Sequence, residues 1–84
     1  MDKLEYALVT LKNNKQYFVL ENISYQYDIY DLILNVEEEN DIKIVLQEVK
    51  NGKTVLTDVE DKSLLSTLSP LFEEKIKNKQ SSIN

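Results

Sequence analysis

The sequence predicts an α+β domain: a five-stranded antiparallel β-meander with a C-terminal helix packed on one face. Two observations predict this fold. Apolar residues recur at every second position as far as residue 59, and from residue 64 they recur at every third or fourth position. The 84 residues are expected to form one domain over residues 1–79, followed by a polar tail over residues 80–84.

The expected central strand is 29–36. Tyr30, Leu32, Leu34 and Val36 fall on one side of this strand and make that side fully apolar, whereas the other side is half apolar. The fully apolar side is therefore expected to lie against the helix.

Two further apolar stretches, 4–11 and 16–23, are expected to form the first hairpin. The Lys-Asn-Asn-Lys segment between them favours a two-residue turn, because Asn tolerates positive φ, and this turn would pair Leu11 with Gln16. Both faces would then carry apolar pairs, so burial fixes the register only loosely. The segment after the second strand has no Gly and is expected either to form a wider loop or to continue both strands as a twisted ribbon.

The second hairpin has the stronger turn signal. Its strands are expected over 42–47 and 54–59, with Asn-Gly at the centre of the turn between them. A two-residue turn at this position sets Leu46 opposite Thr57.

A helix is expected beyond residue 59, with Asp58 or Asp61 at its N-cap. Pro70 interrupts the helical pattern, because proline removes one backbone hydrogen bond. Either one helix is kinked near 66–69, or two short helices meet with Ser69 capping the second. One stripe of the helix is apolar: Leu64, Leu65, Leu68, Leu71, Phe72 and Ile76.

The helix and the central strands are expected to share one core. Several strands are apolar on both faces, which is more than one short helix can cover, so self-association through the uncovered face is expected. The residues expected at the centre of the core are Leu32, Leu34, Ile44, Leu46, Leu64, Leu68 and Phe72.

Composition excludes several classes of chemistry. The chain has no Cys and no His, which removes thiolate metal sites, cysteine nucleophiles and the side chain that titrates nearest neutral pH. Its ten basic residues are all Lys against fifteen acidic residues, and the net charge of −5 opposes direct binding to nucleic acid. No apolar run is long enough to span a membrane, and the N-terminal residues lack the pattern of a secretory signal, so a cytoplasmic location is expected.

The order of sequence features resembles a known family. Phe-Val-Leu-Glu-Asn-Ile-Ser-Tyr from Phe18, Tyr-Asp-Leu-Ile-Leu from Tyr30, an acidic linker, Lys-Asn-Gly-Lys and Val-Glu-Asp from Val59 follow one another. Over residues 8–76 this order resembles the small YrzB-like family of uncharacterised bacterial proteins and its phage-borne relatives. The resemblance implies the same α+β fold and carries no activity. The chain differs from that family in lacking a glycine after the second strand and in having Pro70.

Two groups of residues are candidate contact sites. Tyr25, Tyr27 and Tyr30 could form an aromatic patch for a protein partner, since Tyr is enriched at interfaces, although Tyr also simply suits half-buried strands. The acidic group could instead bind a divalent cation, although a solvated acidic loop explains it more simply. Its members are Glu37, Glu38, Glu39 and Asp41. The acidic group could also contribute to a phosphate-like surface together with Asp28, Asp31, Glu48, Asp58, Glu60 and Asp61.

These observations predict a small acidic protein without catalytic residues, cofactor or metal, acting as a protein–protein interaction module. Its expected contact surfaces are an outer strand edge, the second sheet face or the region 25–30. The alternative is a phage- or prophage-encoded acidic inhibitor that occupies the nucleic-acid site of a DNA- or RNA-binding protein, whose capture of its target would weaken steeply with salt.

Overall fold

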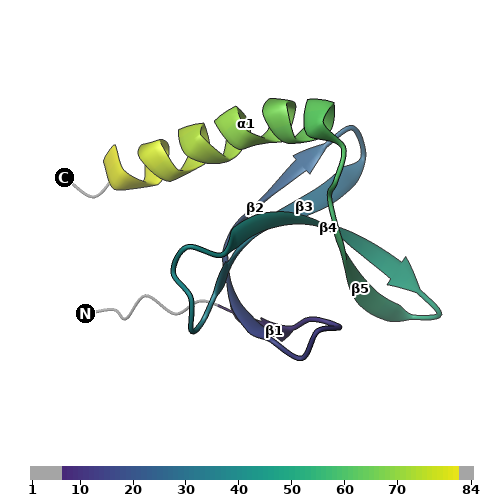
Figure 1. The fold of residues 1–84 in the computed structure, drawn as a ribbon. Coiled ribbons are helices and arrows are strands. Elements are labelled where there is room, and N and C mark those ends of the chain that lie inside the picture. The colour runs from purple at the N-terminus through teal and green to yellow at the C-terminus, as the bar shows by residue number, and fades with distance from the viewer. Residues whose placement is uncertain (1–6, 82–84) are drawn as a thin grey trace.

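The computed structural model describes residues 7–81, with side chains as far as residue 78, and shows five strands and one helix (Figure 1). The strands form one antiparallel sheet in which their order is their order in the chain. The predicted α+β meander with a C-terminal helix is therefore confirmed. The elements are β1 (Ala7–Thr10), β2 (Gln16–Tyr25), β3 (Asp28–Asn35), β4 (Ile42–Lys50), β5 (Lys53–Asp58) and α1 (Lys62–Ser81).

The sheet curls into a half-barrel, with α1 lying across its outer face and β1 and β5 turning away from the helix (Figure 1). A β-bulge in β2 contributes to this curl. The register with β3 shifts between Val19 and Glu21, which leaves Leu20 as an extra residue. A bulge bends its strand and increases the local twist. Residues 4–6 of the predicted first strand lie outside the described residues.

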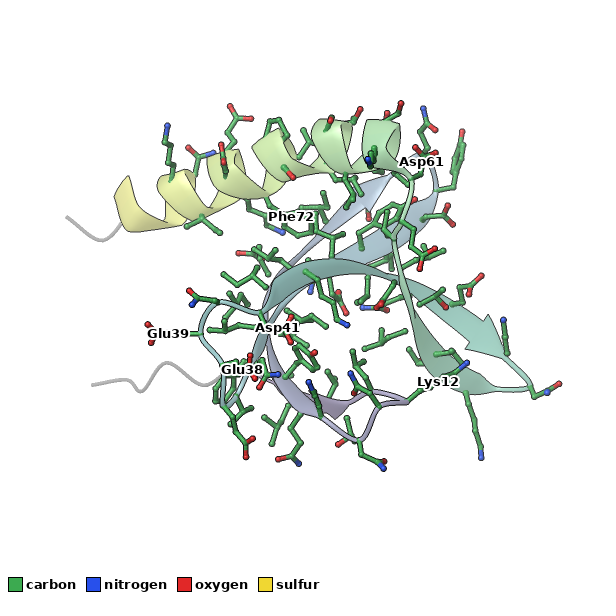
Figure 2. All side chains as sticks on the ribbon, viewed as in Figure 1. Lys12, Glu38, Glu39, Asp41, Asp61 and Phe72 are labelled. Atoms are coloured by element: carbon green, nitrogen blue, oxygen red, sulfur yellow. The ribbon has the colours of Figure 1, made fainter. Side chains whose placement is uncertain are left out.

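The outer core fills the space between the sheet and α1. It consists of Tyr30 and Ile44 from the sheet and Leu68 and Phe72 from the helix, all buried. Figure 2 shows Phe72 directed from α1 toward the sheet. Leu32, Leu46 and Leu64 pack against this cluster as expected and are half-buried, whereas Leu34 is half-buried without joining it.

The inner core lies on the opposite face and consists of Tyr17, Ile33 and Val45. All three are almost fully buried, packed by side chains that include Val9 from β1 and Leu56 from β5. The curl of the sheet brings its own outer strands over part of this face, which one helix alone leaves uncovered. Self-association through this face stays a prediction.

The first hairpin differs from the prediction by one residue. Thr10 lies opposite Gln16, whereas a two-residue turn would have placed Leu11 there. Leu11 accepts a hydrogen bond from the backbone N–H of Asn14 (2.9 Å), and its own N–H donates to the carbonyl of Lys15 (3.0 Å). With Asn14 at a φ of 65°, this is a three-residue loop in which a left-handed residue follows a turn.

The other two hairpins have tight turns. Leu46 lies opposite Thr57 as predicted, and Asn51 and Gly52 occupy the turn with positive φ. The turn after β2 is equally short, with Gln26 and Tyr27 at φ values of 49° and 72°. The wider loop does not form; both strands continue beyond their predicted ends and stay paired as far as Tyr25 and Asp28, as the extended-ribbon alternative predicted. The two turn residues are non-glycine residues in a conformation that favours glycine.

Helix α1 begins at an aspartate cap. The side chain of Asp61 accepts hydrogen bonds from the backbone N–H groups of Ser63 (2.9 Å) and Leu64 (3.3 Å), which confirms one of the two predicted caps. The helix runs through Pro70 without division and ends at Ser81, inside the predicted tail. The two-helix alternative is therefore wrong. Pro70 is exposed, and the buried side chains on either side of it hold the helix on the sheet.

A polar contact also fastens α1 to β2. Lys75 lies 3.4 Å from a carboxylate oxygen of Glu21, and its ammonium donates a hydrogen bond to the backbone carbonyl of Asn22 (2.6 Å). Glu21 is buried beneath the helix, so this lysine compensates a charge that is largely removed from water.

Candidate functional site: a cleft between the outer strands

The two outer strands of the half-barrel flank a cleft of about 610 Å³. Ala7, Val9 and Val19 line one side of this cleft, and Thr54 and Leu56 line the other. These residues share the cleft because alternate positions of each strand point to the inner face and the curl turns β1 and β5 toward each other. The walls are mainly apolar, and the volume falls within the range of about 300–1,000 Å³ that is typical of ligand sites.

Both strands beside the cleft have an open edge. Within the described residues, β1 pairs only with β2 and β5 pairs only with β4. Strand β5 begins at Lys53 and ends at Asp58, and charges of this kind discourage pairing with another chain. The sequence of β1, Ala-Leu-Val-Thr, contains no charged residue, and Leu8 is 52% exposed. The edge of β1 is therefore the less protected of the two.

The floor of the cleft is polar. Asp31 from β3 and Gln47 from β4 line it, and the amide nitrogen of Gln47 donates to both carboxylate oxygens of Asp31, at 2.9 and 3.0 Å. Asp31 is only 3% exposed. Burial raises the pKa of Asp31 above its usual value, and the hydrogen bond from Gln47 acts in the opposite direction.

A second carboxylate organises one end of the inner core. One oxygen of Asp41 accepts hydrogen bonds from the hydroxyl of Tyr17 (2.7 Å) and from the side-chain amide of Asn35 (3.0 Å). These two bonds, from Asn35 first and then from Tyr17, hold the pKa of Asp41 below its usual value. The side-chain oxygen of Asn35 also accepts from the backbone N–H groups of Glu37 and Glu38. This network shapes the β3–β4 loop.

The structure does not gather the three candidate tyrosines on one surface. Tyr30 is buried in the outer core, and Tyr25 is half-buried against the same cluster. Tyr27 alone is fully exposed, at the tip of the β2–β3 turn. The aromatic contact hypothesis is thus reduced to Tyr27 and the exposed part of Tyr25.

The candidate acidic residues are also divided. Glu37, Glu38 and Glu39 are exposed on the β3–β4 loop and do not line the cleft. Asp41, in contrast, accepts hydrogen bonds from Tyr17 and Asn35. Figure 2 shows Glu38, Glu39 and Asp41 at this loop. Over residues 7–81, no three acidic side chains lie close enough together to hold a metal ion. An acidic surface on this loop therefore consists of three residues rather than four.

Sequence reasoning missed the cleft and the pair at its floor. The only available signal was Asp31, an ionisable residue at the centre of the most apolar strand. Asp31 becomes a buried carboxylate at the floor of a cleft only because the sheet curls around the face on which it lies, and the sequence does not show this curl. Gln47 gave no signal, because a polar residue at an alternating position of a strand is ordinary.

Comparison with known proteins adds no assignment: no protein-family model, curated protein or solved structure matches this chain. The resemblance to the YrzB-like family therefore stays a prediction. No helix in the described part of the chain is long and apolar enough to cross a membrane.

Proposed function

We propose that this protein is a small non-catalytic interaction module that holds an extended segment of a partner protein in the cleft between β1 and β5. The observation that carries this proposal is the cleft itself, which has an open strand edge on each side. An extended peptide fits such an edge, because its backbone N–H and C=O groups repeat at the same spacing as those of the strand. A peptide in this position would gain backbone hydrogen bonds from the edge and apolar contacts from the walls.

The edge of β1 is the proposed docking strand. It carries no charge along Ala7–Thr10, and its inward side chains, Ala7 and Val9, already line the cleft. Pairing there would extend the sheet over the inner face and continue the curl from β2. Strand β5 has a charged residue at each end, which discourages pairing, so we expect β5 to form the opposite wall of the cleft without pairing with the peptide.

The chemistry of the cleft favours binding over catalysis. Among the described residues that line it, Asp31 is the only buried titratable side chain, and its hydrogen bonds come from the amide of Gln47. General acid–base catalysis needs a titratable group placed against a reacting atom and open to proton exchange. Asp31 is 3% exposed and both its oxygens accept hydrogen bonds from the Gln47 amide, so it is better suited to binding a ligand group than to transferring protons.

Peptide selection tests this proposal. Random peptides displayed on phage are selected against the folded chain, and the enriched sequences are synthesised and titrated against it with amide chemical-shift mapping. We expect the shifts to concentrate in β1 and at the residues lining the cleft. Failure to enrich any peptide would contradict the proposal, as would shifts confined to the Glu37–Glu39 loop with steep salt dependence. The latter result would favour the acidic-inhibitor hypothesis.

A matched pair of variants on β1 sharpens the test. Ala7→Trp places a bulky ring in the mouth of the cleft, and Leu8→Trp places the same ring on the outward side of the same strand. We expect Ala7→Trp to weaken peptide binding about tenfold or more and Leu8→Trp to leave it nearly unchanged. Equal effects from both variants would place the peptide elsewhere.

A further inference from the structure

We propose that the extended segment held in the cleft carries a lysine or arginine whose cationic head forms an ion pair with Asp31. This inference rests on the proposed function and names the chemistry of the segment.

Asp31 is a buried carboxylate whose charge has no cationic partner in the described part of the chain. Its hydrogen bonds come from a neutral amide, and none of the lysines there forms an ion pair with it. The contrast with Glu21 is direct, because that buried carboxylate lies 3.4 Å from Lys75. An isolated buried charge is costly, and a cation brought by a ligand would remove most of that cost.

The residues opposite Asp31 on the neighbouring strands are neutral. Asn22 lies opposite it on β2, Val45 lies opposite it on β4, and Gln47 donates to it from the same side as the cleft. Lys12 also lines the cleft, but it is exposed and belongs to the loop after β1. The immediate neighbours of Asp31 are therefore neutral, and Lys12 is the one cationic side chain among the described residues that line the cleft.

The walls suit the rest of a basic side chain. Val9, Val19 and Leu56 provide apolar surface between the mouth of the cleft and its polar floor. Lysine and arginine bury their aliphatic stems along apolar surface while the charged head meets a polar group. A basic residue pointing inward from a strand paired with β1 would therefore satisfy both the walls and the floor.

A double-mutant cycle tests this pairing. A peptide enriched by selection is compared with versions in which each lysine or arginine is replaced by glutamine, against the wild-type chain, Asp31→Asn and Asp28→Asn. Asp28 is exposed at the end of the same strand, so its variant makes the same change in net charge away from the cleft. We expect one basic residue whose loss weakens binding to the wild type and to Asp28→Asn about thirtyfold or more. With Asp31→Asn, the loss is expected to shrink to about threefold or less.

The carboxylate provides a second measurement. The pKa of Asp31, followed by the carbon chemical shift of its carboxyl group, should fall when the wild-type chain binds the basic peptide and should not fall with the glutamine version. Peptides that bind at β1 without any preferred basic residue would overturn the ion pair and leave the proposed function standing. Peptides insensitive to Ala7→Trp would overturn the proposed function as well.

Discussion

The outer face of the sheet is covered by a separate element, α1, whereas the inner face is partly covered by the curl of the sheet itself, which leaves a cleft. The outer core is made of apolar side chains and one tyrosine, and Glu21 at its margin is neutralised by Lys75. The inner core lies beside a cleft whose floor holds Asp31, which forms no ion pair with the lysines that the structure describes. We therefore expect the outer face to supply most of the stability and the proposed binding site on the inner face to supply less.

The largest expected effect is on the outer face. Phe72→Ala should lower the free energy of unfolding by about 3–5 kcal/mol, because it removes a buried ring and leaves a cavity between α1 and the sheet. Urea denaturation followed by circular dichroism measures the change. Leu71→Ala, at the exposed neighbouring position, should cost less than about 1 kcal/mol. Similar losses at the two positions would mean that the helix is not packed as described.

A smaller loss should follow removal of the lysine above Glu21. Lys75→Met should destabilise the chain by about 1–2 kcal/mol, because it removes a cation that lies 3.4 Å from a buried carboxylate, although Lys75 itself is partly exposed. Lys77→Met removes the same charge from an exposed position on the same helix and serves as the control. Equal melting temperatures for both variants would contradict a role for the Glu21–Lys75 contact.

On the inner face, one substitution should stabilise the chain. Asp31→Asn should raise the free energy of unfolding at pH 7 by about 1 kcal/mol, since it removes a buried charge and still offers Gln47 an oxygen acceptor. Because burial raises the pKa of Asp31 in the folded state, the wild type loses stability as pH rises through that value. The advantage of the variant should therefore vanish in acid, below the usual aspartate pKa.

Thermal melts of wild type, Asp31→Asn and the control Asp28→Asn across this pH range measure the difference. An advantage for Asp31→Asn that persists in acid, or that Asp28→Asn shares, would mean that the charge of Asp31 is not the cause.

The smallest effect is expected at a turn that belongs to neither core. Replacing Gln26 by Asn and Tyr27 by Gly should stabilise the chain by about 0.5–1 kcal/mol, because both positions have positive φ and Asn-Gly suits such a turn. Chemical denaturation gives the change, and peptide affinity should stay the same. A loss of affinity would instead favour the original hypothesis of a tyrosine contact at this turn.

The elements could be predicted from the sequence where a local signal determines them. Asn51-Gly52 fixes the β4–β5 register, and the Asp61 cap begins α1 where the apolar period changes. The first hairpin was displaced by one residue because Asn14, and not a pair of turn residues, takes the left-handed conformation. In the observed register Val9 lies opposite Tyr17 and packs against the inner core.

The cleft could not be predicted, because it depends on curvature. Curvature is a property of the whole sheet: it includes the bulge at Leu20 and the resulting approach of β1 and β5. No short sequence pattern predicts either feature. Without the curl, Asp31 would lie on an exposed face and require no explanation. The apolar residues on both faces of the strands do form two cores, and the second core is partly covered by the outer strands of the sheet.

Amide hydrogen exchange of each strand, with and without a selected peptide, tests the central claim most directly. In the free chain, we expect slow exchange across β3 and rapid exchange at the outward N–H groups of β1 and β5, which no other described strand pairs with. The peptide should slow exchange in β1 and leave α1 unchanged. Protection of both edges in the free chain, or peptide-induced protection confined to α1 or the β3–β4 loop, would contradict an open inner face that accepts a strand.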